Sequence, residues 1–243
     1  MPRVRESFPT TRYSIVTASA SDNADVRRPA FDALVTAYWK PVFKYARVKW
    51  HATPDEAADL TQAFFLRAFE KDFFGAFDAR QARFRTYLRT CLDGFVANAR
   101  KAEGRLKRGG HLQIIQLDVD AAERELQRLA PNAIDDVDAY FHREWLRTLF
   151  ATAIARFREQ CAGRDRARRF TIFERYDLAE DEERRPTYAE LAVALGLAAT
   201  DVTNELAAAR REFRRLVLDV VREQCASDDE FHAEARAFMR SAP

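Results

Sequence analysis

Glycine, cysteine and long apolar runs are all scarce in this sequence. Its 243 residues include seven glycines, which is few for a strand-rich fold with many tight turns. Cys91, Cys161 and Cys225 stand far apart and form no CxxC pair, which indicates reduced, buried thiols rather than a disulfide framework. No window approaches about 18 apolar residues and no signal peptide opens the chain, so we expect a cytoplasmic protein without membrane insertion.

Signatures of catalysis and of cofactor binding are also missing. The sequence contains no HExxH, no Gly-rich phosphate loop and no GxSxG motif. Its four histidines stand singly, without the spacing of metal ligands: His51, His111, His142 and His232. We therefore expect no catalytic residue, no metal and no cofactor, and the chain is not predicted to be an enzyme.

Helix-forming residues and segregated charges dominate the composition. Alanine, leucine, arginine and glutamate are abundant, and hydrophobic residues make up 47% of the chain, which is enough for a core. The net charge is only +2. Residues 80–108, however, hold nine Lys/Arg against two Asp/Glu, and residues 118–138 hold seven Asp/Glu against two Arg. A basic block followed by an acidic one says more about partners than the total charge does.

The apolar pattern predicts an all-α fold of two small helical domains joined by an acidic linker. Apolar residues recur at helical spacing over 31–50, where Pro41 predicts a kink or a break, and in steps of four over 137–161. The stretch from Thr53 to Glu56 has the spacing of a capping box. The expected segments are a loose N-terminal extension (1–28), a first domain (29–110), the linker (111–136), a second domain (137–226) and a C-terminal helix (227–243).

The stretch PTYAELAVALGLAATDVTNELAAARREFRRL has the pattern of a helix-turn-helix. Gly196 follows a short apolar helix at the position where a left-handed residue ends a helix. The outward residues of the second helix are Thr203, Asn204, Ala207, Arg210 and Arg211. Asn and Arg side chains read base edges or hold phosphates, which favours DNA binding over an ordinary helical hairpin with a polar face. Five arginines against five acidic residues over 199–225, Glu205 among them, predict weak phosphate attraction.

The stretch ARFRTYLRTCLDGFVANARKAEGRLKRGG combines cations with aromatic residues. Arginines cluster at its start and Lys/Arg at its end, with Phe84, Tyr87 and Phe95 between them. Cations that follow a phosphate backbone, beside aromatics that stack on unpaired bases, are typical of a surface for single-stranded nucleic acid. Helical spacing also puts Phe84, Leu88, Cys91 and Phe95 on one face, so a core stripe with a basic outer side fits the same residues.

A third stretch, DLTQAFFLRAFEKDFF, has apolar residues on two faces of one expected helix. Leu60 and Phe64 point one way, and Phe65 and Phe69 point roughly the opposite way, with Gln62 among them. A helix needs one apolar face for its own core, so the second face predicts a partner. The alternative is a central helix sandwiched within its own domain.

Together these stretches resemble a bacterial RNA polymerase sigma factor of the extracytoplasmic-function subgroup, which keeps only sigma domains two and four. AYWKPVFKYARVKW, PDEAADLTQAFFLRAFEKDFF and the basic stretch resemble sigma domain two, and PTYAELAVALGLAATDVTNELAAARREFRRLVLDVV resembles sigma domain four. The resemblance covers about residues 30–110 and 137–222. It implies recruitment of core RNA polymerase to chosen promoters, with domain two recognising and melting the −10 element and domain four reading the −35 element.

The resemblance also implies which residues meet each partner. The expected contacts with the largest-subunit clamp of core polymerase are Asp59, Leu60, Gln62, Phe65 and Phe69. The expected contacts with −10 DNA are Arg83, Arg85, Tyr87, Asn98, Arg100 and Lys101. The expected contacts with −35 DNA are Thr203, Asn204, Arg210 and Arg211. The polymerase flap and a protein regulator such as an anti-sigma factor complete the implied partners.

Two positions depart from the family pattern. Asp93-Gly94 replaces an Arg-Asn pair, which predicts a weaker helix and an altered melting loop. Glu205, Ala207 and Ala208 stand where basic residues are usual, which predicts weak or absent DNA binding by the C-terminal domain alone. The acidic linker either threads through a basic channel of the polymerase in the manner of nucleic acid or acts as a solvated spacer.

The helix-turn-helix also fits a second function, that of a stand-alone transcriptional regulator that binds DNA without polymerase. Such a regulator is expected to be dimeric and to bind its operator alone. Co-purification with core polymerase separates the two functions.

Overall fold

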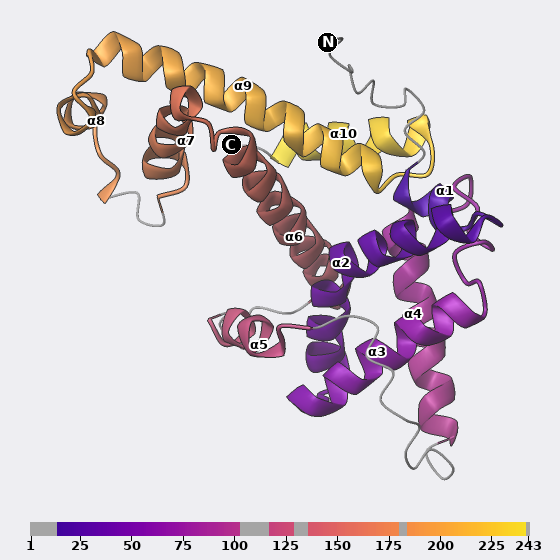
Figure 1. Ribbon diagram of the computed structural model, residues 1–243. Helices are drawn as coiled ribbons and strands as arrows, with labels where there is room; N and C mark the ends of the chain where they lie inside the picture. The colour runs from indigo at the N-terminus through magenta and orange to yellow at the C-terminus, as the bar shows by residue number, and fades with distance from the viewer. Residues whose placement is uncertain (1–13, 103–116, 129–135, 180–183, 242–243) are drawn as a thin grey trace. The chain divides into compact units, whose positions relative to one another are not determined.

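The computed structural model describes residues 14–102, 117–128, 136–179 and 184–241 (Figure 1). Ten helices and no strand are found in these ranges, which confirms the all-α prediction. In chain order the helices are α1 (Ile15–Ser19), α2 (Ala24–Lys49), α3 (Pro54–Glu70), α4 (Phe84–Ala102), α5 (Val119–Gln127), α6 (Val137–Gln160), α7 (Arg164–Asp177), α8 (Tyr188–Leu195), α9 (Ala199–Glu223) and α10 (Asp228–Ser241). None of these helices is by itself long and apolar enough to cross a membrane.

Side-chain caps determine where two of the expected helices begin. At the start of α3, the Thr53 hydroxyl accepts the Glu56 N–H at 3.3 Å, and the Glu56 carboxylate accepts the Thr53 N–H at 2.8 Å. Thr187 and Glu190 form the same reciprocal pair at the start of α8. A cap of this kind contributes about 1 kcal/mol, so the local sequence is sufficient to set these two boundaries.

The segment expected to be a loose N-terminal extension contains α1 and the first turns of α2. Ser14 caps α1, with its Oγ accepting the Thr17 N–H at 3.1 Å. Asn23 caps α2 through a side-chain oxygen that accepts the Asp25 N–H at 2.9 Å. The expectation of a loose segment is therefore wrong for the described part of residues 1–28, because these caps start helices that the polar composition concealed.

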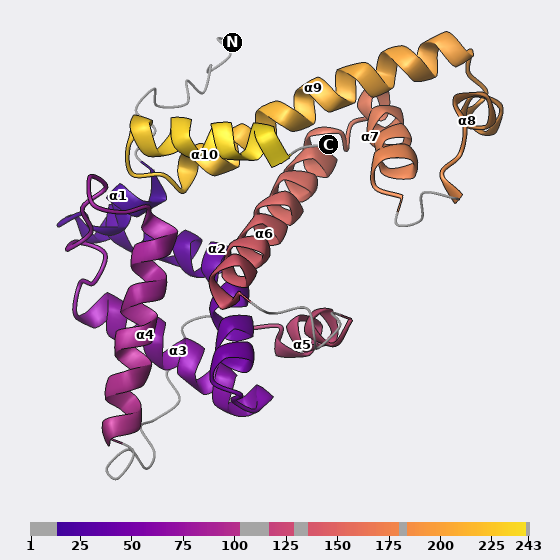
Figure 2. The same cartoon turned by 180° about the vertical axis from the view of Figure 1, so that it is seen from behind.

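Helix α2 continues through Pro41, where a kink or a break was expected. The helix has no break from Ala24 to Lys49, but its ribbon changes direction between its two halves in both views (Figures 1 and 2). A proline inside a helix costs about 3 kcal/mol or more, because it removes a backbone hydrogen bond and crowds the preceding turn. Trp39, Val42 and Phe43 are buried on either side of Pro41, and burial of about 1.5–3 kcal/mol for each such side chain offsets that cost.

The described chain forms two compact units. The first unit comprises Met1–Thr148 with Val221–Pro243, and the second comprises Leu149–Val220. Helices α6 and α9 therefore contribute residues to both units. These limits differ from the expected second domain, because the start of α6 and the chain after α9 pack together within the first unit. The Trp145 Nε1–H donates to Gln224 Oε1 at 2.6 Å, in a buried hydrogen bond between these two segments.

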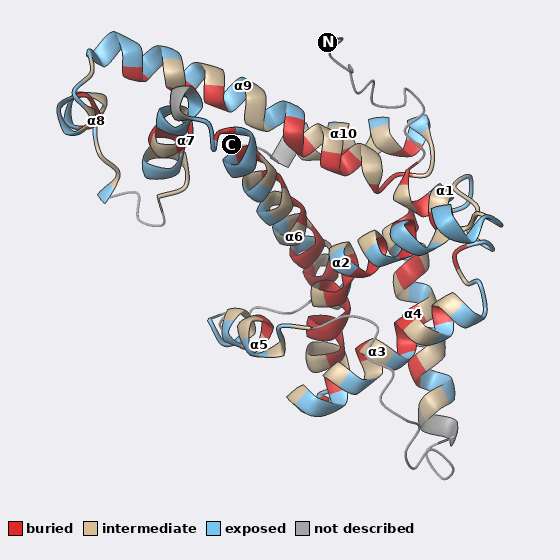
Figure 3. Ribbon diagram, in the orientation of Figure 1, coloured by how far each residue is buried: buried red, intermediate tan, exposed pale blue. Residues whose placement is uncertain are grey.

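Aromatic side chains around α2 form the core of the first unit. Phe31 of α2 stacks against Phe74 with ring centroids 5.6 Å apart and meets Phe65 of α3 edge-on at 6.5 Å. Tyr38 meets Phe84 of α4 edge-on at 5.6 Å. Buried residues line most of α2 and the neighbouring parts of α3 and α4 (Figure 3), and α3 crosses α4 in both views (Figure 2). Each fully buried ring contributes about 1.5–3 kcal/mol, so this cluster is the main support of the first unit.

Two apolar clusters hold the second unit together. One consists of Phe157, Cys161, Phe170, Phe173, Ala209 and Leu216. The other consists of Ile172, Leu191, Ala192, Val202 and Leu206. Helices α7 and α9 contribute to both clusters, so these two helices together determine where α8 packs.

Part of the expected acidic linker is a helix that packs against α2. Residues 119–127 form α5. Its ion pairs with α2 are Glu123–Arg47 at 2.6 Å, Glu125–Lys40 at 2.7 Å and Glu125–Lys44 at 2.7 Å. A solvated spacer is therefore the wrong description of this segment, because cations of α2 neutralise its carboxylates. Residues 111–116 and 129–135 of the expected linker lie outside the described ranges.

All three cysteines are free thiols, and two of them are buried as expected. Cys161 lies in the core of the second unit and Cys225 in the first unit, whereas Cys91 is only half-buried. Burial, together with the nearby carboxylates of Glu230 and Glu234, raises the pKa of the Cys225 thiol. This thiol therefore stays protonated and unreactive at neutral pH.

Replacing Gly94 with alanine is expected to stabilise the protein by about 1 kcal/mol. Gly94 is exposed in the middle of α4, and an added Cβ meets no atom within 4 Å. Urea unfolding of the full chain measures the change. The matched control Gly196→Ala is expected to destabilise by about 1–2 kcal/mol, because Gly196 has a φ of 64°. A Gly94→Ala protein no more stable than the wild type contradicts the prediction.

Candidate nucleic-acid and protein interfaces

Helices α8 and α9 have the geometry of a helix-turn-helix. Helix α8 ends at Leu195, Gly196 adopts the left-handed conformation at φ 64° and ψ 39°, and α9 begins at Ala199. The chain bends by 103° between the two helices, within the range of about 90–120° for this motif. The Leu197 N–H donates to the Ala192 carbonyl oxygen at 2.9 Å and closes the turn. The local sequence therefore produces a rigid, bent helix pair.

The outer face of α9 near this turn carries polar and small side chains. Thr203, Asn204, Ala207 and Arg211 are exposed there. The Thr203 hydroxyl donates to the Ala199 carbonyl oxygen at 3.0 Å, within its own helix. Asn204 and Arg211 make no hydrogen bond or ion pair with other residues in the described part of the chain, so both are available to base edges or phosphates.

Arg210 was expected to meet DNA from the same face, but it is bound to α7. Its guanidinium donates two hydrogen bonds to the Asp177 carboxylate, at 2.8 and 2.9 Å, and lies over the Tyr176 ring at 5.6 Å. The hydrogen bonds that it donates to Asp177 raise the pKa of Arg210. A bidentate pair of this kind fixes the direction of the guanidinium. In this geometry Arg210 holds α7 against α9 rather than presenting a free cation to DNA.

Glu205 faces α7 rather than the expected DNA surface. Its carboxylate accepts a hydrogen bond from Arg169 at 2.8 Å and pairs with Arg168 at 3.6 Å. Glu212, two turns later, pairs with Arg169 at 3.2 Å and with Arg166 at 3.4 Å. Arginines of α7 thus neutralise the acidic residues of α9. The Glu205 charge is therefore already paired within the chain, and the prediction of weak −35 binding stays a prediction.

The arginines at the start of α4 are paired with the C-terminal helix. Arg85 donates a hydrogen bond to Glu234 of α10, and Arg83 pairs with the same carboxylate at 3.3 Å. The Arg85 guanidinium also lies over the Trp145 ring at 4.9 Å, and its side chain is only 13% exposed. Both arginines were expected to contact −10 DNA, and here a carboxylate of the chain itself occupies them.

Glu230 and Glu234 are functional candidates that the sequence analysis missed. The Glu230 carboxylate accepts the Phe84 N–H at 2.7 Å and the Ala226 N–H at 2.9 Å. Glu230 and Phe84 are 146 residues apart in the chain. The one local signal was the spacing of four residues between the two glutamates, which places both on one face of α10. That spacing does not indicate which surface the face meets.

Tyr87 was expected to stack on a DNA base, but its side chain is part of the first unit. Its hydroxyl donates to the Phe73 carbonyl oxygen at 2.6 Å, and its ring is tilted against Phe77 at 5.2 Å. Burial first, and then the neighbouring Cys91, raise the pKa of Tyr87. Tyr87 therefore holds the loop after α3 against α4.

Three further residues were expected to meet −10 DNA from the second half of α4. Asn98 is exposed on this helix. Arg100 and Lys101 belong to the helix, but their side chains lie outside the described residues. Asn98 is thus the one of the three whose described position suits a contact with DNA.

Asp93 has a partner within the first unit. Lys49 donates to both carboxylate oxygens of Asp93 at 2.8 Å, and the Tyr45 hydroxyl donates to one of them at 3.2 Å. Helix α4 runs without interruption through Asp93 and Gly94. Asp93 thus lies within a continuous helix and pairs with a lysine of α2, and the prediction of an altered melting loop stays a prediction.

Both apolar faces of α3 are covered within the first unit. Phe65 is 1% exposed and meets the rings of Phe31 and Phe64, so the expected contact between Phe65 and polymerase is wrong. Phe69 is half-buried against Phe31 at 4.9 Å, with the Arg27 guanidinium over its ring at 5.0 Å. Phe64 on the opposite face is fully buried. The sandwiched helix was the correct alternative.

The side of α3 that remains accessible is mainly polar. Asp59 is exposed, and Leu60 and Gln62 are half-buried. Thr61 between them points inward, and its hydroxyl donates to the Ala57 carbonyl oxygen at 2.6 Å. Asp59 and Gln62 make no hydrogen bond or ion pair with residues of the described ranges. A partner of α3 would therefore meet Asp59, Leu60 and Gln62.

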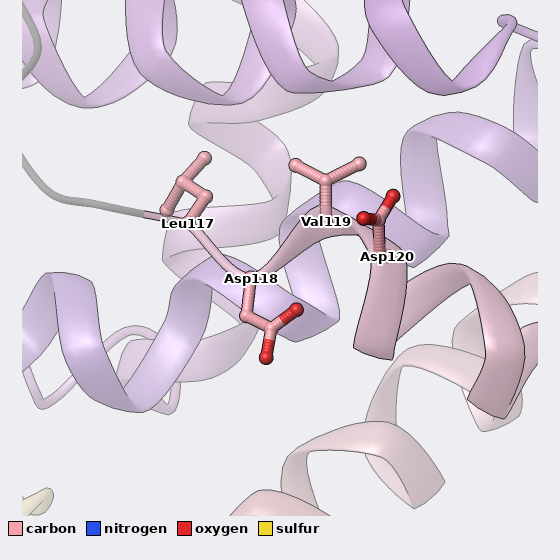
Figure 4. A pocket seen from close by; sticks show the side chains of 4 residues that line it. All are labelled: Leu117, Asp118, Val119 and Asp120. Carbon is pink, nitrogen blue, oxygen red and sulfur yellow. The ribbon is translucent and has the colours of Figure 1, made fainter.

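A pocket at the start of α5 is lined by Leu117, Asp118, Val119 and Asp120 (Figure 4). The two carboxylates lie on different sides of the chain. Asp118 Oδ1 accepts the Ala121 N–H at 2.9 Å and thereby caps α5. The carboxylates do not converge as an acid–base pair would. Among the residues that the structure describes, no group of three or more His, Cys, Asp or Glu side chains is placed to hold a metal ion.

The geometry leaves two candidate surfaces. We define the α3 surface as Asp59, Leu60 and Gln62, and the α9 surface as Asn204 and Arg211. No protein-family model, no curated protein and no solved structure matches the chain.

His142 lies beside the Arg85 cluster in surroundings that keep its ring neutral. The ring stacks on Trp145 at 5.6 Å, and its Nδ1 is buried with no hydrogen-bond partner in the described structure. Burial first, and then the positive charges of Arg85, Arg83 and Arg143, lower the pKa of His142 from 6.5 to about 4.

Stability is expected to fall as the pH is lowered from 6.5 to about 4. In this range His142 takes up a proton in the unfolded chain but not in the folded protein. The expected loss is about 1–2 kcal/mol, after allowing for solvent screening at a half-buried ring. Urea unfolding at several pH values measures it, and His142→Gln removes this part of the pH dependence. An NMR titration of the His142 ring with a midpoint near 6.5 contradicts the prediction.

Proposed function

We propose that the chain is an alternative sigma factor, which binds core RNA polymerase and directs it to chosen promoters. The observation that carries this proposal is the bent helix pair α8–α9 with Asn204 and Arg211 exposed beside its turn. A helix-turn-helix inserts the first turns of its second helix into the major groove, where Asn and Arg recognise adenine and guanine edges. The resemblance of the first unit to sigma domain two adds the polymerase to this DNA-binding role.

The charges on α9 support attraction to DNA. Glu205 and Glu212 are paired with arginines of α7. Arg211, Arg214 and Arg215 are exposed along the same helix. Because Glu205 and Glu212 are paired while Arg211, Arg214 and Arg215 are exposed, this stretch of α9 presents more positive than negative charge to a phosphate backbone; Asp201 is an exposed carboxylate at its start.

The two candidate surfaces have separate roles in this proposal. The α9 surface reads the −35 element, and the second unit meets the polymerase flap. The first unit binds the polymerase clamp through the α3 surface and recognises and melts the −10 element. This role is not enzymatic, uses no metal or cofactor and requires a cytoplasmic location. An anti-sigma factor or another protein regulator is a further proposed partner.

Replacing Asn204 with alanine is expected to lower promoter-specific transcription roughly tenfold, because one good base contact contributes about 1–3 kcal/mol. The measurement is run-off transcription over genomic promoters with purified core polymerase and the full chain. Arg175→Ala is the matched control, since Arg175 is exposed on the neighbouring helix α7. It is expected to leave transcription unchanged.

The same experiment separates the sigma factor from a stand-alone regulator. A sigma factor gives transcription only when core polymerase is added, and core binding survives the Asn204→Ala change. A regulator binds its operator tightly in a gel shift without polymerase and does not co-purify with core. The second result replaces the proposal with the regulator function.

The double change Asp59→Ala with Gln62→Ala is expected to weaken binding to core polymerase by about tenfold, as removal of central interface side chains does. The fold is expected to survive, because Asp59 is exposed and Gln62 is half-buried. Co-purification with core measures binding, and thermal unfolding measures the fold. Asp32→Ala changes an exposed carboxylate of α2 and is the control. Normal core binding by the double variant shows that the α3 surface has been misassigned.

A further inference from the structure

Two carboxylates of the C-terminal helix occupy the N-terminal end of α4. Glu230 accepts the backbone N–H of Phe84, the first residue of α4, at 2.7 Å. Glu234 lies one turn later and pairs with Arg85 and Arg83. The start of a helix offers unsatisfied N–H groups and a positive dipole to an anion. One of these N–H groups, that of Phe84, and the flanking arginines Arg83 and Arg85 are engaged by α10.

The most deeply buried side chains in the described part of α10 are two carboxylates. In the described part of α10, only Glu230 and Glu234 are buried, at 7% and 4% exposure. Phe231 is half-buried, and the Arg222 guanidinium covers its ring at 4.6 Å. A buried ion pair gains little net free energy, because desolvation of both charges opposes their attraction. Exchange of these carboxylates for another anion is therefore a small change in free energy.

A DNA phosphate satisfies the same groups. It is an anion with several acceptor oxygens, and helix N-termini and arginines are its usual partners in proteins. If the proposed function holds, Arg83 and Arg85 face the −10 DNA. Phosphates of the promoter and carboxylates of α10 would then require the same cations at the same time.

We propose that α10 is an autoinhibitory helix, in which Glu230 and Glu234 occupy the DNA-binding start of α4 until phosphates of the promoter displace them. The inference rests on the proposed function of the first unit. In the free protein, α10 shields Arg85, whose side chain is 13% exposed, from unspecific polyanions. Binding of DNA releases Glu234 from Arg85 and makes this guanidinium accessible.

The test uses the full-length protein and the variant Glu234→Gln. Glutamine keeps the size of the side chain and an acceptor oxygen but removes the charge that competes with phosphate. The probe is a short fluorescein-labelled single-stranded DNA of mixed sequence, and fluorescence anisotropy measures its Kd. We expect the variant to bind about tenfold more tightly than the wild type, the effect of one charge-assisted pair.

Asp229→Asn is the matched control, because Asp229 is an exposed carboxylate of the same helix and its loss changes the net charge equally. The control is expected to bind DNA within about twofold of the wild type, since an exposed charge is screened by salt. Hydrogen exchange of the α10 amides in the wild type is the second measurement. These amides are expected to exchange faster when the DNA probe is bound.

Two results overturn the proposal. One is a folded Glu234→Gln protein that binds the probe no more tightly than the wild type. The other is α10 amides that remain equally protected in the complex of the wild type with DNA. If Glu234→Gln fails to fold, hydrogen exchange of the wild type alone decides between autoinhibition and a permanent structural role for α10.

Transcription by the wild type and DNA binding by Glu234→Gln together distinguish failure of the autoinhibition proposal from failure of the proposed sigma-factor function. If the wild type supports transcription but Glu234→Gln binds the DNA probe with unchanged affinity, the sigma-factor function stands and the autoinhibition proposal is wrong. If the wild type supports no transcription with core polymerase but Glu234→Gln binds DNA more tightly, the proposed sigma-factor function is wrong. In that case the competition between α10 and DNA remains established for the free chain.

Discussion

The buried charge of Lys44, in the middle of α2, is the constraint on which the first unit depends. The side chain of Lys44 is 1% exposed, and an unpaired ammonium at such a site costs several kcal/mol. Glu144 of α6 at 2.6 Å and Glu125 of α5 at 2.7 Å neutralise it. Two helices from distant parts of the chain must therefore lie against α2. This requirement explains why α5 and the first half of α6 belong to the first unit.

Ion pairs attach the other peripheral helices in the same way. Examples of pairs that join one helix to another are Lys49–Asp93 for α2 and α4, Arg169–Glu205 for α7 and α9, and Arg85–Glu234 for α4 and α10. Glu205 and Arg85, in the last two pairs, are charges that the sequence analysis placed on DNA-binding surfaces. A run of like charges in such a chain therefore indicates a nucleic-acid site only after its internal pairs have been found.

The helices were predictable from the sequence because caps and apolar periodicity are local features. Gly196, for example, ends α8 and begins the turn of the helix-turn-helix by its own conformational freedom. The partners of the charged side chains were not predictable, because they come from far along the chain. The difference between local features and distant partners also explains which parts of the candidate site were predictable. The exposed position of Asn204 follows from its helical register, whereas the engagement of Arg85 and the burial of Phe65 depend on residues of other helices.

The division between an aromatic core and ion-paired outer helices has a consequence for how the first unit can change shape. Salt and polyanions weaken ion pairs but leave buried rings in place. The hydrogen bond from Arg47 lowers the pKa of Glu123, so this pair of α5 stays ionised and sensitive to competing charges at neutral pH. The contacts of α10 with Arg83 and Arg85 are of the same kind. A charged partner would thus exchange α5 or α10 for its own groups, while the core of α2, α3 and α4 keeps its structure.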